Sequence, residues 1–114
     1  MIKGTFKRDA AGKIVSYEIS GHAHAGEYGS DIVCAAVSVL ALSTINGINA
    51  LADVQPLIDA DEAEGGYLYV EIPSDLTQEQ TKITQILLEN LLLGFQAVQE
   101  ENSDYIQLEI LKKS

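Results

Sequence analysis

The chain has 114 residues, a length sufficient for one globular domain with a single core, and we predict that residues 1–114 form one domain. Its content of 46% hydrophobic and 21% charged residues is ordinary for such a domain. Seventeen Asp and Glu against seven Lys and Arg give a net charge of −10, which argues against direct binding of nucleic acid. The chain has a single cysteine and no secretory signal pattern, and we expect no stretch long enough to span a bilayer. We therefore predict a cytoplasmic protein that does not act on a membrane.

The first twenty residues predict a β-hairpin. Residues 2–8 alternate, with Ile2, Gly4 and Phe6 on one face. The segment Asp9-Ala10-Ala11-Gly12-Lys13 has the composition of a turn. Residues 14–20 form the second predicted strand, and its apolar face is expected to hold Val15, Tyr17 and Ile19. Residues 21–30 contain three glycines, and their apolar residues do not recur at a helical or strand spacing, so we expect a loop there.

A long helix is predicted from Asp31 to about Asp53. Its sequence is apolar over most of the helix circumference, which is typical of a buried helix. Ser30 or Asp31 can cap its first turn. The expected apolar stripe consists of Ile32, Val33, Val37, Leu40, Ala41, Ile45, Ile48 and Leu51, and it is widened by Val39 and Leu42.

A second hairpin and a second helix follow. Residues 54–61 and 67–72 alternate around Glu64-Gly65-Gly66, which indicates two strands joined by a turn. Thr77-Gln78-Glu79-Gln80 matches a capping box and begins a helix that is expected to run to about Glu100. Its core stripe is predicted to be Ile83, Ile86, Leu87, Leu91, Phe95 and Val98. Leu88 and Leu92 fall partly off this stripe and are candidates for contact with another subunit.

Residues 104–111 alternate again and predict a last strand, with Ile106, Leu108 and Ile110 on one side. The element order is therefore β-β-α-β-β-α-β. Because each helix follows a hairpin, we predict an α+β fold in which two helices pack on a mostly antiparallel sheet.

Cys34 is the strongest candidate for chemistry. A thiol in the first turn of a helix faces unpaired backbone N–H groups and the positive end of the helix dipole. Both favour the thiolate, which is the nucleophilic form. His22, at the end of a predicted strand, could remove the thiol proton and later protonate the leaving amine. The alternative is that Cys34 is a small core residue and His22 a structural histidine.

Neighbouring polar residues have weaker claims. Asp31 can cap the helix or orient His22, and Ser38, one helical turn after Cys34, can donate a hydrogen bond in the site or to a backbone carbonyl. His22, His24, Asp31 and Cys34 are only a weak candidate metal set, because no second cysteine supports them. Glycines 21, 26 and 29 lack the spacing of a phosphate-binding loop. We therefore expect no metal and no cofactor.

The strings Gly21-His22-Ala23 and Asp31-Ile32-Val33-Cys34-Ala35-Ala36-Val37-Ser38 resemble the ribosomal-processing cysteine protease family, known as Prp. The resemblance covers the whole chain in length and element order. It implies that His22 and Cys34 are the catalytic dyad and that Gly21, Asp31 and Ser38 are supporting positions. It also implies a homodimeric endopeptidase from a Firmicute-like bacterium.

The implied substrate is the amino-terminal extension of large-subunit ribosomal protein number twenty-seven, cleaved after a pair of aromatic residues. Ribosomal proteins are basic, which fits the acidic chain. We further expect residues 23–30 to cover the bound substrate, with Gly26 and Gly29 as permissive positions and Tyr28 as the closing side chain. Two alternatives stay open: a non-enzymatic ribosome-assembly adaptor with a buried Cys34, and a thiol-based redox sensor.

Overall fold

The computed structural model describes residues 1–21, 28–61 and 66–112, and it confirms the predicted order β-β-α-β-β-α-β. The helices and strands are β1 (Ile2–Arg8), β2 (Ile14–Ser20), α1 (Tyr28–Ala52), β3 (Leu57–Asp61), β4 (Tyr67–Glu71), α2 (Gln78–Glu101) and β5 (Ile106–Lys112).

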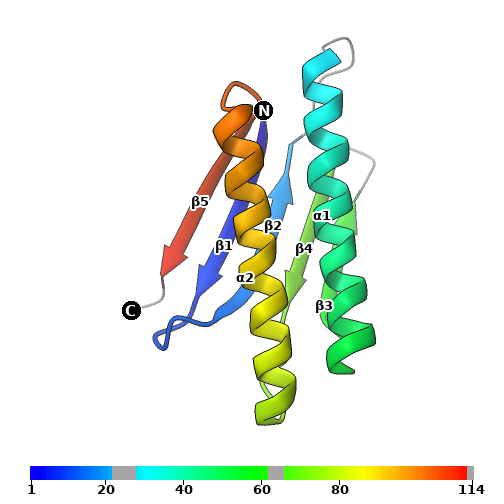
Figure 1. Ribbon diagram of the computed structural model, residues 1–114, viewed down its shortest axis with the longest axis vertical. Helices are drawn as coiled ribbons and strands as arrows, with labels where there is room; N and C mark the ends of the chain where they lie inside the picture. The colour runs from blue at the N-terminus through cyan, green and yellow to red at the C-terminus, as the bar shows by residue number, and fades with distance from the viewer. Residues whose placement is uncertain (22–27, 62–65, 113–114) are drawn as a thin grey trace.

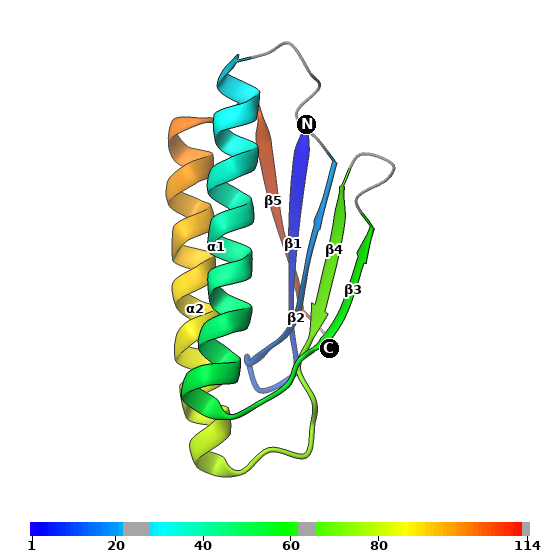
Figure 2. The same cartoon turned by 90° about the vertical axis from the view of Figure 1, so that its right-hand side faces the viewer.

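The five strands form one sheet in the order β3-β4-β2-β1-β5. Every neighbouring pair is antiparallel except β1 and β5, which are parallel. Both helices lie on the same face of the sheet, α2 antiparallel to α1, and no described helix or strand covers the opposite face (Figure 1 and Figure 2). The predicted α+β fold, with two helices on a mostly antiparallel sheet, is therefore confirmed.

The core lies between the helix layer and the sheet. Ile2 and Phe6 of β1 are buried as predicted, and the Phe6 ring meets the Phe95 ring edge-on at a centroid distance of 5.3 Å. Gly4 lies between Ile2 and Phe6 in β1, and a Cβ added to Gly4 would lie 2.6 Å from the Phe95 ring. A side chain at position 4 would thus displace Phe95, so α2 approaches β1 this closely only because residue 4 is glycine.

The turn of the first hairpin follows the prediction, but one strand face does not. The Asp9 carboxylate accepts hydrogen bonds from the Ala11 and Lys13 amides, and Gly12 has a positive φ of 90°. Between Arg8 and Lys7 the register against β2 shifts by one residue. Because of this irregularity Ile14, and not Val15, is the buried residue at the start of β2.

Strand β3 begins at Leu57, three residues later than expected. The chain leaves α1 through Asp53, whose φ of 55° is left-handed, and Val54 is buried in the core without being part of a strand. Pro56 has no N–H to donate, so regular pairing starts only after it.

Helix α1 differs from its prediction at its start and in its burial. It begins at Tyr28, so the expected caps Ser30 and Asp31 lie inside the helix and residues 28–30 are not a loop. Only one side of the helix is buried. Segment Ile32–Ala52 has 21 residues with a mean hydropathy of 1.8, so the expectation that no stretch could span a bilayer is wrong by length and composition.

Helix α2 begins with the predicted capping box. The Thr77 hydroxyl accepts a hydrogen bond from the backbone N–H of Gln80, and the side-chain oxygen of Gln80 accepts one from the backbone N–H of Thr77. Its buried side, however, is rotated from the expected one. Leu88 and Leu92, proposed as subunit contacts, are in the core, whereas Ile86, proposed as core, is 61% exposed. The side that faces the sheet consists of Thr84, Leu88, Leu91, Leu92 and Phe95.

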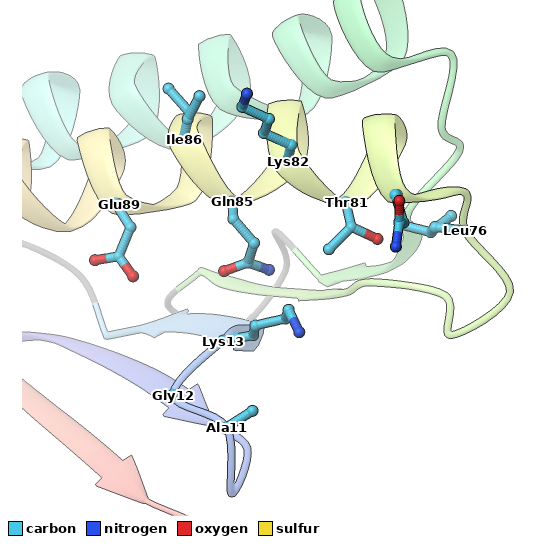
Figure 3. A pocket seen from close by; sticks show the side chains of 10 residues that line it. Ala11, Gly12, Lys13, Leu76, Thr81, Lys82, Gln85, Ile86 and Glu89 are labelled. Carbon is cyan, nitrogen blue, oxygen red and sulfur yellow. The ribbon is translucent and has the colours of Figure 1, made fainter.

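Two polar contacts tie α2 to the first hairpin. The Gln85 side-chain amide accepts from the Ile14 N–H at 2.9 Å and donates to the Ile14 carbonyl at 2.8 Å, as a neighbouring strand would. Arg8 binds both carboxylate oxygens of Glu89. These contacts border an open hollow of about 660 Å³ between the hairpin turn and α2, and none of the predicted site residues that the structure describes lines it (Figure 3).

The Arg8–Glu89 pair predicts a pH-dependent contribution to stability. The hydrogen bond from Arg8 holds the pKa of Glu89 below its ordinary value. A carboxyl group whose pKa is lower in the folded state than in the unfolded state stabilises the fold at pH values above its unfolded-state pKa. This stabilisation is lost as the pH falls through the folded-state pKa. We expect Glu89→Gln to lower the free energy of unfolding by at most about 1 kcal/mol at pH 7, because both side chains are partly exposed. Urea titrations of both proteins should converge at acidic pH, and an equal difference at every pH would contradict this assignment.

Candidate active site

Cys34 lies in a cleft of about 430 Å³ together with two other predicted site residues, Gly21 and Ser38. The residues that line this cleft come from one end of β1, β2, β3 and β4 and from α1. Figure 1 shows that these strand ends lie at the end of the sheet where α1 begins. Cys34 and Ser38 are one helical turn apart on α1 and so border the same hollow. Three predicted residues are thus brought together around one cavity.

Gly21 has a conformation that explains why glycine stands directly before His22. Its φ is 85°, in the left-handed region that side chains rarely adopt. An added Cβ would lie 2.3 Å from the Met1 carbonyl oxygen, which is backbone and cannot move aside easily. Because Gly21 also lines the Cys34 cleft, this turn brings the chain to the rim of the cleft just before residue 22.

The position of Cys34 in its helix differs from the expectation. Since α1 begins at Tyr28, Cys34 is its seventh residue and lies in the second turn. The prediction that its thiol faces the unpaired N–H groups of the first turn is therefore wrong, because those groups belong to the first four residues of the helix, Tyr28 to Asp31. The side chain is half-buried and packs against the core while lining the cleft.

A buried hydrogen bond holds α1 in place beside the sheet. The Tyr17 hydroxyl on β2 donates to the Ala41 carbonyl of α1 at 3.0 Å, and burial raises the pKa of Tyr17. Ala41 lies one turn beyond Val37, and both line the cleft. Tyr17 therefore helps to set the distance between the helix that carries Cys34 and the strands opposite it.

Several lining residues were not found by the sequence analysis. They come from the second hairpin and from the middle of α1, and no spacing in the sequence links them to Cys34. Among the described residues, Tyr67 is the only aromatic residue that lines this cleft. The pKa of Tyr67 is raised above its ordinary value, mainly by a side-chain hydrogen bond with Glu18. The missed residues are Ala60, Gly66, Tyr67 and Leu68 from the second hairpin and Val37, Ala41 and Leu42 from α1, and Ile2 and Ile19 of the first two strands also line the cleft.

The remaining predicted site residues are only partly within the described structure. His22, His24 and Gly26 lie outside the described residues, so neither the dyad nor the weak metal set is tested by the geometry. Gly29 and Tyr28 belong to α1 and not to a loop, which corrects the expected extent of the covering segment. Asp31 is within the helix, and its side chain is outside the described part of the structure.

Comparison with known proteins gives concordant results. The family model described as cysteine protease Prp matches residues 1–107. The ribosomal processing cysteine protease Prp of Bacillus subtilis (strain 168) is 33% identical over 108 residues, which cover 95% of this chain and 96% of the relative.

Two solved structures are similar throughout. The crystal structure of SMU.848 from Streptococcus mutans has a TM-score of 0.89 and 38% identity, covering 99% of this chain and 96% of that chain. The ribosomal processing protease Prp from S. aureus, solved in complex with a substrate peptide, has a TM-score of 0.83 and 29% identity, covering 96% and 99% of the two chains. The chain therefore belongs to the cysteine protease Prp family.

Proposed function

We propose that this chain is an endopeptidase in which Cys34 is the nucleophile and His22 the general base. The observation that carries the proposal is that Cys34, the single cysteine of the chain, lines the cleft beside Gly21, the residue before His22. A covalently linked product peptide in the S. aureus relative is what a nucleophilic thiol would leave in such a cleft. It favours an enzyme over the adaptor and redox-sensor alternatives.

In the proposed reaction His22 first takes the thiol proton. The Cys34 Sγ then bonds to the carbonyl carbon of the scissile peptide, the C–N bond breaks, and the leaving nitrogen receives the proton from His22. Water hydrolyses the resulting thioester: its oxygen bonds to the carbon, its proton passes to His22, and the C–S bond breaks. Ser38 borders the same hollow and is proposed as a hydrogen-bond donor to the reacting group. Asp31 is proposed to orient His22.

We propose the amino-terminal extension of a bacterial large-subunit ribosomal protein, number twenty-seven, as the substrate. The named relatives are ribosomal processing proteases, and one was crystallised with a substrate peptide. The cleft lining is largely apolar, with Leu42 one helical turn after Ser38 and with Ala60 and Leu68 of the second hairpin available to hold an apolar or aromatic side chain next to the scissile bond. This lining is compatible with the aromatic pair that the family resemblance implies.

Other parts of the function remain proposals. A bacterial source and a homodimer come from the same resemblance, whereas the cytoplasmic location comes from the cysteine content and the expected lack of direct contact with nucleic acid from the net charge. The segment of residues 23–30 is still proposed to cover the bound peptide. In the structure Tyr28 and Gly29 already belong to α1, and residues 23–27 of the proposed cover lie outside the described residues.

The proposed activity is tested by incubating the purified protein with the extended ribosomal protein and weighing the products. The expected result is two fragments whose masses sum to that of the substrate plus one water, with a single cut after the aromatic pair. A substrate with both aromatic residues changed to alanine serves as the control and should remain uncut. Intact extended protein after prolonged incubation would reject the proposed substrate.

Salt should weaken cleavage of the full-length substrate. The chain carries a net charge of −10, so a basic protein is attracted over long range, and this attraction is screened beyond about 8 Å at physiological ionic strength. We expect kcat/KM at low substrate concentration to fall as salt is raised. A short uncharged peptide that spans the same cleavage site should show little change. Equal salt sensitivity of the two substrates would argue that the acidity serves only solubility.

A further inference from the structure

The face of the sheet that is turned away from the helices carries polar and aromatic side chains that the core does not use. In Figure 2 both helices lie on one side of the sheet, and none of the described helices and strands covers the other side. Phe6, Tyr17 and Val70 are paired across β1, β2 and β4 and are buried toward the helices. Because successive side chains of a strand point to opposite faces, Glu18 and Tyr69, the neighbours of Tyr17 and Val70, lie on the uncovered face.

One part of this face, formed by β2, β4 and β3, combines carboxylates with aromatic rings. We name it the outer sheet patch, and its residues are Glu18, Asp59, Asp61, Tyr67, Tyr69 and Glu71. No Lys or Arg occurs in β2, β3 or β4. Basic residues of the same face are on β1, where Lys3 pairs with Glu109 of β5. The outer sheet patch is therefore the strongly negative half of the uncovered face.

The register of the strands places one aromatic ring of the patch between two carboxylates. Glu18 of β2 is directly opposite Tyr69 of β4, and Tyr69 is directly opposite Asp59 of β3. Directly opposite side chains have Cβ atoms about 4.5–5.5 Å apart, so these three side chains can contact one and the same group. A group held there would meet an aromatic ring with a carboxylate on each side of it.

The carboxylates of the patch have hydroxyl partners but few cationic ones. The Tyr69 hydroxyl donates a hydrogen bond to Glu71 at 2.6 Å, and Tyr67 is hydrogen-bonded to Glu18. Within the described part of the chain, Glu18, Asp59 and Glu71 form no salt bridge with a Lys or Arg. An aromatic ring attracts a cation to its face, and arginine in particular stacks on such a ring while its N–H groups bind carboxylates. The chemistry of the patch therefore fits the basic side chains of another protein.

The outer sheet patch is continuous with the rim of the Cys34 cleft. Ala60 and Tyr67, at the ends of β3 and β4, line that cleft, and Tyr67 and Asp61 belong to the patch. Strand β3 is an edge of the sheet, and all five of its residues are exposed. An extended peptide advances about 3.3 Å per residue, so four residues span roughly 13 Å. A substrate chain can thus pass from the cleft around this edge onto the outer face within a few residues.

We propose that the outer sheet patch binds a Lys- or Arg-rich segment of the protein substrate, a few residues away from the scissile bond. A chain with net charge −10 repels acidic proteins and nucleic acids but attracts a basic segment, and on this face the attraction meets no opposing cation from β2, β3 or β4. Only the identity of the partner rests on the proposed function, because the proposed ribosomal substrate is basic. The binding site itself rests on the strand register and on the charges of the patch.

Fluorescence anisotropy with the Cys34→Ala variant, in which cleavage cannot intervene, tests the binding site. The probe is a fluorescein-labelled peptide in which Arg and Gly alternate over about eight residues. Adding Glu18→Gln and Asp59→Asn removes two carboxylates without changing side-chain size and should raise the Kd by roughly 5- to 10-fold. Asp75→Asn with Glu79→Gln is the matched control, because it removes the same charge where α2 begins, and it should change the Kd by less than about 2-fold.

Two variants of Tyr69 test the aromatic ring of the site. Tyr69→Phe keeps the ring and should bind within about 2-fold of its parent, whereas Tyr69→Leu should bind roughly 2- to 5-fold more weakly. Circular dichroism shows whether each variant is folded, and the carboxylate variants decide the outcome if a Tyr69 variant is not. Equal effects of the two double variants, or equal binding by folded Tyr69→Phe and Tyr69→Leu, would overturn the proposal in favour of net charge alone.

Cleavage of the extended ribosomal protein, measured with Cys34 intact, separates this proposal from the proposed function. Both hold if the wild type cuts the substrate and Glu18→Gln with Asp59→Asn lowers kcat/KM more than the control pair does. If the wild type cuts and both pairs lower kcat/KM equally, the docking site is overturned while the protease assignment stands. If the wild type does not cut but the probe binds with the expected pattern, the proposed substrate is rejected and the docking site stands.

Discussion

Replacing Cys34 by alanine is expected to abolish cleavage, with a loss of at least about 10³-fold in kcat/KM, while the protein stays folded. Without the sulfur no thioester can form. His22→Ala should cause a loss of similar size, because a thiol without its base is only partly in the nucleophilic form. Cys34→Ser should also be nearly inactive, since an alcohol is much harder to deprotonate than a thiol. Product formation followed by mass spectrometry measures each loss.

The double variant separates a dyad from two independent residues. If both groups act in one covalent step, Cys34→Ala combined with His22→Ala should be no slower than Cys34→Ala alone. Ser38→Ala is a suitable control on the same cleft, with a smaller loss expected because it removes one hydrogen-bond donor. Near-normal cleavage by purified Cys34→Ala or His22→Ala would reject the proposed dyad.

Truncating Leu88 is expected to destabilise the fold by about 2 to 5 kcal/mol. Leu88 is fully buried between α2 and the sheet, so Leu88→Ala leaves a cavity where the surrounding groups cannot fully relax. Such a loss is a large part of the roughly 5–15 kcal/mol that holds a domain of this size together. Urea denaturation followed by circular dichroism gives the free energy of unfolding.

Leu57→Ala provides a matched control, because the same atoms are removed from a side chain that is 58% exposed on β3. Its effect should stay within about 0.5 kcal/mol. The comparison tests the buried side of α2 directly, since the sequence pattern placed Leu88 off the core stripe. Equal, small effects of the two substitutions would contradict the orientation of α2 in the structure.

The sequence was sufficient for the element order but not for the sides of the helices. Strand β1 shows the expected alternation of burial, strand β4 forms where it was predicted, and the capping box at Thr77 begins α2 as expected, because these signals depend on residues close in the chain. In α2, apolar residues stand on several overlapping stripes. Which stripe is buried was decided by packing, where the Phe95 ring fits over Gly4 of β1 and turns Leu88 and Leu92 inward.

The start of α1 shows the same limit. Its glycines and lack of apolar period suggested a loop to residue 30, yet the helix begins at Tyr28, and this moves Cys34 from the first turn to the second. The helix dipole therefore acts less on Cys34, because its effect falls off within the first turn. The importance of Cys34 now depends on its place in a cleft, which no local pattern could show.

By itself the sequence determined the order of strands and helices and singled out Cys34 and His22 as candidates for chemistry, because periodicity and motifs are properties of neighbouring residues. Only the tertiary structure decided that Cys34, Ser38 and Gly21 share a cleft with Tyr67 and Ala60, and that Val39 and Leu93 face outward. The physical reason is that burial depends on contacts between segments far apart in the chain. A helix as apolar as α1 has several sides that could be buried, and the sheet covers only one of them.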